Sequence, residues 1–187
     1  MKEELRKQYK LLRLKISDDY KKEKSLNASD IFLRHELYNG SRIIMSYKPL
    51  GKEIDTELIM NRAYRDGKKI ILPVTDYDTG IITPCYADES VDFIKGAFSI
   101  EEPLEKIAAD INDADVVLVP GIAFDRAGNR IGFGKGCYDM LLKKYKGIKI
   151  GYCYKFQIAD YIPSDEYDIK MDYILCEEEI IICDKEN

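Results

Sequence analysis

The sequence predicts an α/β fold in which an open, mostly parallel sheet lies between helices on both faces, in three layers. Short apolar runs alternate along the chain with segments of helical periodicity. These runs are apolar on both faces of the expected strands, so the sheet needs cover on both sides. The chain has 187 residues, 45% of them hydrophobic, with no internal repeat or linker. We therefore expect a single domain over residues 1–187.

Two helices are expected at the start of the chain. Four apolar side chains share one helical face at spacings of four, three and four, which predicts a first helix. They are Leu5, Tyr9, Leu12 and Ile16. A second helix is expected to begin after Ser17, whose hydroxyl suits an N-cap, and to run to about Leu37.

Strands and helices alternate in the rest of the sequence. Apolar runs predict strands at 42–47, 69–74, 114–119, 148–152, 173–176 and 180–183. Residues 81–83 are a hairpin partner for 69–74 across the turn at 78–80. One further helix is expected to be capped by Asp55 or Thr56 and to stop at Gly67, and another to run from about 136 to 145.

Residues 120–139 follow the least ambiguous strand and are rich in glycine. In a parallel sheet, ligands bind beyond the carboxyl ends of the strands, so this segment is the first place to look for a site. Glycines at 132, 134 and 136 lead into the expected helix, where backbone amides can approach an anion closely. Arg130 and Lys135 add two cations, and Asp139 adds a carboxylate in the first helical turn. Together these groups suit a polyphosphate with a divalent cation.

The spacing of this segment excludes two common nucleotide motifs. No Ser or Thr follows Lys135, so it is not a Walker A loop, and the spacing is not that of a dinucleotide-binding fingerprint. A simpler alternative stays open, in which the glycines form a flexible turn and Asp139 only stabilises the start of a helix.

Charge, hydropathy and cysteine usage exclude several classes of protein. The net charge is −5, with +4 in residues 1–24 and −9 in the remainder, which argues against duplex nucleic acid as a partner. No run is long and apolar enough to span a membrane. The five cysteines form no C-x-x-C pair, so we expect reduced thiols and a cytoplasmic protein. A single histidine excludes a multi-histidine metal site.

The segment 120–139, which reads PGIAFDRAGNRIGFGKGCYD, resembles the signature of the 5-formyltetrahydrofolate cyclo-ligase family. Further matches occur in order along most of the chain. They are Lys2 and Arg6 ahead of a basic amphipathic helix, the run 53–56, Leu72-Pro73-Val74 and Lys170-Met171-Asp172.

The resemblance implies a sheet of the type shared with ribose-phosphate isomerases and CoA transferases. It also implies an enzyme that uses ATP and Mg²⁺ to close 5-formyltetrahydrofolate, a reduced folate, into 5,10-methenyltetrahydrofolate. The residues implied to contact ATP are Lys2, Arg6, Arg130, Ile131, Gly132, Phe133, Gly134, Lys135, Gly136, Cys137 and Tyr138. Those implied to border the folate are Lys48, Glu53, Phe133, Gly134, Lys135, Gly136 and Cys137. Asp139 and Asp172 would serve the metal, and Arg130 and Lys135 would balance the charge of the transferred phosphoryl group.

Two positions depart from the family pattern. Cys137 stands where a tyrosine is common, and Lys48 stands where an apolar residue is more usual. Lys2, Arg6, Lys10 and Arg13 form a basic stripe beside the apolar face of the first helix. Taken alone, this stripe is typical of a solvated helix edge whose side-chain stems cover the core. The resemblance changes that interpretation for Lys2 and Arg6 only, which it implies to contact ATP.

Three functions remain to be compared. The leading hypothesis is the ATP- and Mg²⁺-dependent cyclo-ligase, acting as a monomer or a weak homo-oligomer. A non-catalytic folate or nucleotide binder on the same scaffold is the alternative, although it would not need metal carboxylates. A sugar-phosphate isomerase or acyl-CoA enzyme on the same sheet is a third, and it predicts no dependence on ATP.

Overall fold

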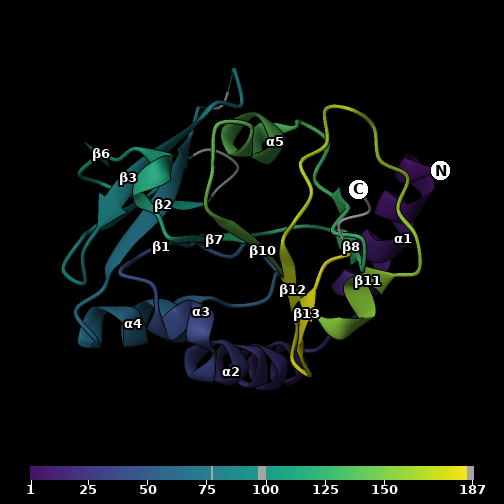
Figure 1. Ribbon diagram of the computed structural model, residues 1–187, viewed down its shortest axis with the longest axis horizontal. Coiled ribbons are helices and arrows are strands. Elements are labelled where there is room, and N and C mark those ends of the chain that lie inside the picture. The colour runs from purple at the N-terminus through teal and green to yellow at the C-terminus, as the bar shows by residue number, and fades with distance from the viewer. Residues whose placement is uncertain (77, 97–99, 185–187) are drawn as a thin grey trace.

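The computed structural model describes residues 1–187 apart from 77, 97–99 and 185–187 (Figure 1). Its described residues form an eight-stranded central sheet, and the α/β architecture predicted from the sequence is confirmed. In order across the sheet the strands are β13 (Ile180–Ile182), β12 (Tyr173–Leu175), β10 (Ile148–Tyr152), β7 (Val116–Val119), β1 (Ile43–Met45), β2 (Lys69–Thr75), β3 (Ile82–Ala87) and β6 (Ile107–Ala108). All neighbouring pairs from β12 to β2 are parallel, while β13, β3 and β6 pair antiparallel at the two edges.

Helices cover both faces of this sheet, as predicted. In Figure 1, α2 (Asp18–Arg34), α3 (Glu36–Asn39) and α4 (Glu57–Arg65) lie on one side and α5 (Cys137–Leu142) on the other. The strands are apolar on both faces for this reason. Ile44, Ile70 and Val116 belong to the core under α2 and α4. Their neighbours Met45, Ile71 and Val117 belong to the second core, to which α5 contributes Leu142.

The first helix, α1 (Lys2–Leu14), lies at the side of the molecule against a small sheet (Figure 1). This sheet has the order β11 (Ile158–Ala159), β8 (Ala123–Asp125) and β9 (Arg130–Ile131). The sequence predicted only a loop between 120 and 132, because charged residues and glycines leave no run of four apolar residues there. The other short elements among the described residues are β4 (Phe93–Lys95), β5 (Glu101–Pro103) and the 3₁₀ helices at Ile111–Asp113 and Lys155–Gln157.

The predicted caps and turns are confirmed at several element ends. The Ser17 hydroxyl accepts a hydrogen bond from the Tyr20 amide, 3.0 Å away, at the start of α2. Thr56 is the N-cap residue of α4, and the Asp55 carboxylate accepts from the Glu57 amide. Gly67 follows α4 with a φ of +71°, and β2 and β3 form the expected antiparallel hairpin.

Two predicted boundaries and one predicted helix face are wrong. The second helix stops at Arg34, because His35 adopts an extended backbone and its Nδ1 accepts from the Leu37 amide to start α3. The last helix ends at Leu142 instead of about 145, since the Tyr145 hydroxyl turns back to donate to the Ala114 carbonyl. On α1, Leu12 is 39% exposed and Arg13 is buried in its place, because Arg13 lies on the same face as the buried Tyr9, and Ile16 lies beyond the end of the helix.

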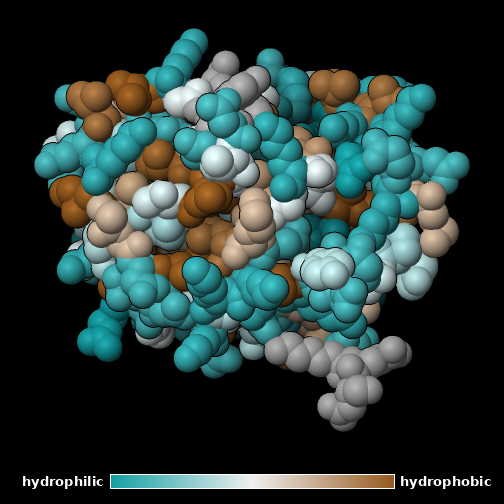
Figure 2. Space-filling model, turned by 90° about the horizontal axis from the view of Figure 1, so that it is seen from above, coloured by the Kyte–Doolittle hydropathy of each residue, from teal (hydrophilic) through white to brown (hydrophobic). Residues whose placement is uncertain are grey.

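The surface seen from above is mostly hydrophilic, with separate patches of apolar side chains between the charged ones (Figure 2). Across the described residues, no helix combines the length and the hydropathy that a membrane crossing requires.

Candidate active site

The glycine-rich segment begins as a hairpin of β8 and β9 joined by a tight turn. The Asp125 carboxylate holds this turn by accepting from the amides of Ala127 and Asn129 and from the Asn129 side chain. Gly128 occupies the turn with a φ of +82°, and its carbonyl accepts from the Met171 amide at 2.8 Å. This hairpin fixes where Arg130 leaves the small sheet and where the following glycines begin.

Beyond β9, Gly134 and Gly136 adopt positive φ. Gly134 has a φ of +110° and Gly136, the residue before α5, a φ of +66°, a region that side chains disfavour. Gly132 acts differently, because an added Cβ would lie 2.9 Å from a guanidinium nitrogen of Arg130. The missing side chain therefore lets Arg130 lie directly against the loop backbone.

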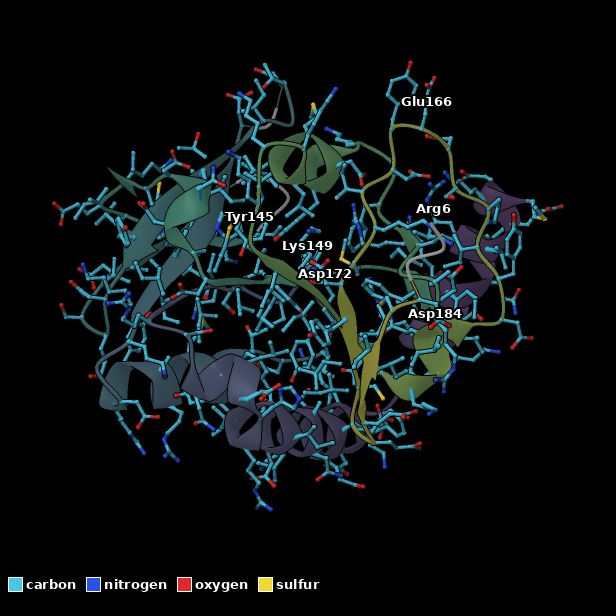
Figure 3. The ribbon with its side chains drawn as sticks, viewed as in Figure 1. Arg6, Tyr145, Lys149, Glu166, Asp172 and Asp184 are labelled. Atoms are coloured by element: carbon cyan, nitrogen blue, oxygen red, sulfur yellow. The ribbon has the colours of Figure 1, made fainter. Side chains whose placement is uncertain are left out.

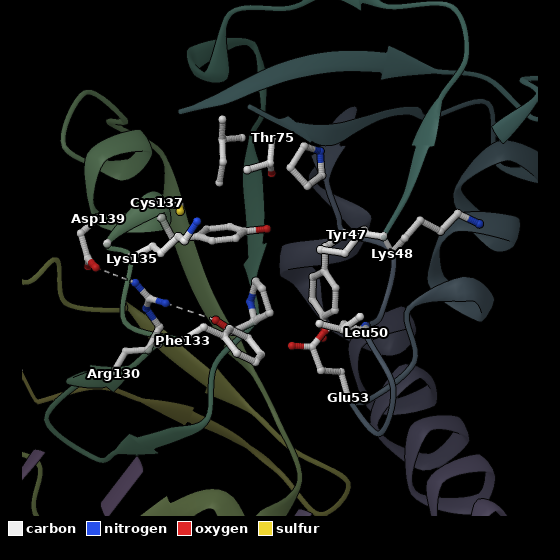
Figure 4. A pocket seen from close by; sticks show the side chains of 17 residues that line it. Tyr47, Lys48, Leu50, Glu53, Thr75, Arg130, Phe133, Lys135, Cys137 and Asp139 are labelled. Atoms are coloured by element: carbon white, nitrogen blue, oxygen red, sulfur yellow. Dashed lines mark hydrogen bonds and ion pairs between the residues drawn. The ribbon is translucent and has the colours of Figure 1, made fainter. Parts of the chain in front are cut away.

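The glycine-rich segment forms one wall of a cavity of about 320 Å³ at the carboxyl ends of β1, β2 and β7 (Figure 4). We call this wall, formed by lining residues between 130 and 139, the glycine wall. The opposite wall comes from the residues after β1. The side chains and backbone of the lining belong to Tyr47, Lys48, Leu50, Glu53, Pro73, Thr75, Ile82, Ile100, Pro120, Arg130, Gly132, Phe133, Lys135, Gly136, Cys137, Tyr138 and Asp139. The position agrees with the expectation for a parallel sheet, because loops after neighbouring strands meet at the same edge.

Arg130 is the charged group at the base of the glycine wall, with only 6% of its side chain exposed. One of its terminal nitrogens donates to Asp139 Oδ2 at 3.0 Å, and the other donates to the Pro120 carbonyl at 3.4 Å. Within the described residues, Arg130 Nε and the Tyr138 hydroxyl are buried without a hydrogen-bond partner. Buried donors of this kind fit an anionic ligand that supplies acceptor oxygens.

Asp139 and Lys135 complete the charged groups of this wall. Asp139 is half-buried, and its second oxygen accepts from the Ile169 amide at 3.3 Å. Lys135 is exposed at the mouth of the cavity. Figure 4 shows Arg130, Lys135 and Asp139 together on the α5 side. The three charged residues named from the sequence, two cations and a carboxylate, therefore line one cavity.

Glu53 lies on the opposite wall and is only 5% exposed. Its Oε2 accepts from the Leu50 amide at 2.8 Å, and its Oε1 lies 3.6 Å from Arg13 Nη1. Burial raises the pKa of this carboxyl above its usual value, against the opposing effects of the Leu50 amide and the Arg13 charge. A carboxylate facing an apolar cavity suits a ligand that presents hydrogen-bond donors at one edge.

Lys48 is in the lining, but its amino group points away from the glycine wall (Figure 4). The ammonium lies 4.2 Å from the centre of the Phe93 ring on β4 and 3.8 Å from the Glu101 carboxylate on β5. The lysine therefore connects the β4–β5 hairpin to this wall.

The basic stripe of α1 reaches the back of the glycine wall. Arg6 Nε donates to the Gly132 carbonyl at 3.0 Å, while the Lys2 ammonium pairs with Asp165 at 3.0 Å and with Asp168. Neither residue lines the cavity, and Gly134 and the buried Ile131 are also outside the lining.

The interpretation of Arg13 as part of a solvated edge is wrong, because its guanidinium is buried and also donates to the Gly121 carbonyl.

Asp172, the second predicted metal ligand, lies away from the cavity lining. Figure 3 shows it beside Lys149, whose ammonium is 2.9 Å from its carboxylate and whose amide donates to the same oxygen at 2.8 Å. No cluster of three or more His, Cys, Asp or Glu side chains fit for a metal occurs in the part of the chain that is described. Of the two predicted ligands, Asp139 alone faces the cavity, so a metal there would need ligand oxygens from a bound substrate.

Known proteins resemble this chain over almost its whole length. The curated 5-formyltetrahydrofolate cyclo-ligase of Mus musculus is 28% identical over 176 residues, 87% of each chain. A probable 5-formyltetrahydrofolate cyclo-ligase of Schizosaccharomyces pombe is 31% identical over 148 residues, covering 70% of this chain and 72% of that protein.

Solved structures agree with this similarity. The NMR structure of the 5,10-methenyltetrahydrofolate synthetase of Aquifex aeolicus superposes with a TM-score of 0.87 at 31% identity, over 100% of this chain and 94% of that one. The synthetase of Mycoplasma pneumoniae, at 24% identity and a TM-score of 0.74, shares the fold. The model of the 5-formyltetrahydrofolate cyclo-ligase family matches residues 1–177. The chain therefore belongs to the 5-formyltetrahydrofolate cyclo-ligase family.

Proposed function

We propose that this protein cyclises 5-formyltetrahydrofolate to 5,10-methenyltetrahydrofolate at the cost of one ATP, with Mg²⁺ as the metal. The observation that supports it most directly is that the two walls of one cavity are unlike. One wall carries Arg130, Lys135 and Asp139 on glycine-rich backbone, and the other carries a buried carboxylate, Glu53, among apolar side chains. Family membership adds the same activity, which is named for the relatives in Mus musculus and Aquifex aeolicus.

The reaction requires activation of an unreactive amide. A formyl oxygen is a poor leaving group, so the γ-phosphoryl group of ATP is transferred to it and ADP is released. The N10 amine then attacks the formyl carbon, its N–H proton is lost, and the carbon–oxygen bond breaks to release inorganic phosphate. Both steps are accelerated mainly by positioning and charge neutralisation, so no nucleophilic side chain is needed.

Each wall has a distinct part in this proposal. Arg130 and Lys135 neutralise charge on the transferred phosphoryl group, and the loop 132–138 binds the polyphosphate through its backbone amides. Asp139 is the residue that would hold Mg²⁺, and the ion would supply positive charge to stabilise the phosphate oxygens. Glu53 accepts hydrogen bonds from the donor edge of the pterin, opposite Phe133. Lys2 and Arg6 lie behind the loop, where Arg6 already holds the Gly132 carbonyl.

An absorbance assay tests the proposal directly. Methenyltetrahydrofolate absorbs in the near ultraviolet where 5-formyltetrahydrofolate does not. Purified protein with ATP, Mg²⁺ and 5-formyltetrahydrofolate should generate this absorbance, and omission of either ATP or Mg²⁺ should abolish it. Folate binding without turnover would instead support the non-catalytic binder, and ATP-independent chemistry on a sugar phosphate or a CoA ester would support the third hypothesis.

We also propose that the protein works in the cytoplasm, as a monomer or a weak homo-oligomer. All five cysteines are free thiols, and four of them are buried, which suits a reducing compartment. Sedimentation of the purified protein across a range of concentrations would measure its state of assembly.

A further inference from the structure

Arg13 occupies a buried position that connects the two walls of the cavity. Leu5 and Tyr9 pack on the small core of β8 and β9, and Arg13 follows Tyr9 by four residues on the same face of α1. Its side chain therefore points inward, over Gly121. The guanidinium donates to the Gly121 carbonyl at 3.3 Å and lies 3.6 Å from the Glu53 carboxylate.

The same guanidinium also lies over the Phe133 ring, 5.3 Å from its centre. Phe133 belongs to the glycine wall and Glu53 to the opposite wall, and both line the cavity. Arg13 itself is outside the lining. One buried cation thus contacts a side chain of each wall without facing the ligand space.

We propose that Arg13 is a positioning residue of the folate subsite, which holds the Glu53 carboxylate and the Phe133 ring in place on opposite sides of the cavity. The proposal rests on the proposed function, because it takes Glu53 and Phe133 as folate contacts. Arginine suits this role better than lysine, since its planar guanidinium can pair with a carboxylate and stack on a ring at once.

Other charged and titratable groups face Glu53 from the surrounding elements. Lys21 on α2 is the second cation that acts on it, and the Lys21 ammonium donates to the Gly51 carbonyl. The hydroxyls of Tyr47 and Tyr138 also face it, and the Glu53 charge adds to the burial that raises their pKa values. Arg13 is the cation whose ion pair with Glu53 is formed, so its removal should affect this carboxyl most.

A carboxyl titration of the ligand-free protein tests the contact without any assumption about substrate. Arg13→Met should raise the pKa of Glu53 as measured by carbon-13 NMR of its labelled carboxyl, because a buried carboxylate loses its nearest cation. Arg13→Lys keeps the charge and should give a smaller rise. Lys7→Met, on the exposed side of the same helix, is the matched control and should leave the pKa unchanged. An unchanged pKa in Arg13→Met would overturn the proposal.

Kinetics then test the consequence for folate. Arg13→Met should raise the KM for 5-formyltetrahydrofolate about tenfold, and the increase should grow as the pH falls, while kcat and the KM for ATP change less than about twofold. In a Glu53→Gln background the same change should raise the KM less than in the wild type, because only the contact of Arg13 with the Phe133 ring is then lost. Equal losses for folate and ATP would overturn the proposal in favour of a general structural role.

Two controls distinguish failure of the Arg13 proposal from misfolding of the variant and from failure of the proposed function. If Arg13→Met fails to fold, Arg13→Lys carries both measurements, since it preserves a buried cation. If the wild-type protein neither binds nor converts the folate, the proposed function fails, while the carboxyl titration still decides whether Arg13 holds Glu53.

Discussion

Arg130 and Asp139 form an ion pair whose strength depends on its surroundings. The guanidinium is almost fully buried and the carboxylate half-buried, so the pair is less screened by solvent than a surface contact would be. Substrate phosphates would enter this environment beside Lys135. A substitution of Arg130, Lys135 or Asp139 should therefore change the electrostatic energy of the other two charges.

We expect Asp139→Asn to lower kcat by about two orders of magnitude at saturating ATP, with a raised requirement for Mg²⁺. The amide keeps the shape of the side chain and removes the charge that a cation needs. Absorbance assays over a Mg²⁺ titration measure both effects. Glu166→Gln, at the outer end of its loop in Figure 3, is the control and should behave as wild type. Wild-type turnover and Mg²⁺ dependence in Asp139→Asn would show that Asp139 takes no part in the mechanism.

Gly128 allows a test of backbone geometry against a matched glycine. Gly128 and Gly67 both have positive φ, +82° and +71°, but an added Cβ at 128 would lie 2.5 Å from the Met171 carbonyl oxygen, and one at 67 would have no neighbour within 4 Å. Gly67→Ala should therefore cost about 1 kcal/mol of unfolding free energy, from strain alone.

Gly128→Ala should cost roughly 3 kcal/mol, because a backbone clash is added to that strain. Urea denaturation of the two variants and the wild type gives the comparison directly. If both substitutions lowered the urea midpoint equally, the clash with the Met171 carbonyl would not contribute to the loss of stability.

At the scale of elements, the sequence predicted most strands of the central sheet because they lie within apolar runs that extend beyond the paired residues. Val116–Val119 is buried throughout and Ile148–Tyr152 is buried from Ile150 onward, and the two runs form adjacent parallel strands. The strands β8 and β9 have three residues and two. They are held by the Asp125 carboxylate and by contacts with distant segments, which no local pattern reports.

The candidate site was predictable to the extent that it is local in sequence. Arg130, Lys135 and Asp139 stand within one segment that also carries the glycines, so their joint placement followed from spacing. Arg13 was missed, although one signal was available: it continues the face of Leu5 and Tyr9 at intervals of four. Its burial depends on Glu53 and Gly121, which come from other elements and are brought together only by folding.

The start of α2 offers a test of how much one cap contributes. Ser17→Ala should lower the free energy of unfolding by about 1 kcal/mol, because the Tyr20 amide loses its acceptor. Ser17→Asn supplies another acceptor and should retain most of the stability. Thermal or urea unfolding monitored by circular dichroism measures the difference. An alanine variant as stable as the asparagine variant would show that water satisfies this amide equally well.

For the molecule as a whole, we expect the buried tyrosines to limit stability at high pH. Burial raises the pKa of several phenols above the usual value of 10.0, and that of Tyr64 to about 12. The others in the interior with a strongly raised pKa are Tyr38, Tyr47, Tyr138, Tyr145, Tyr152 and Tyr154. Because the folded state holds these protons more tightly than the unfolded chain, their stabilising effect is complete below pH 10 and is lost as the pH rises further.

We therefore expect the protein to unfold cooperatively in alkali, with ionisation of the interior phenols and loss of structure in one transition. Tyrosinate absorbance and far-ultraviolet circular dichroism, recorded on the same samples as the pH is raised above 10, should change together for this group. Tyr152→Phe removes the phenol that hydrogen-bonds Ser29 at 3.1 Å and should lower the absorbance amplitude of that transition. Ionisation of all the interior phenols while the circular dichroism stays native would mean that water reaches both cores without unfolding, which contradicts the packing described for them.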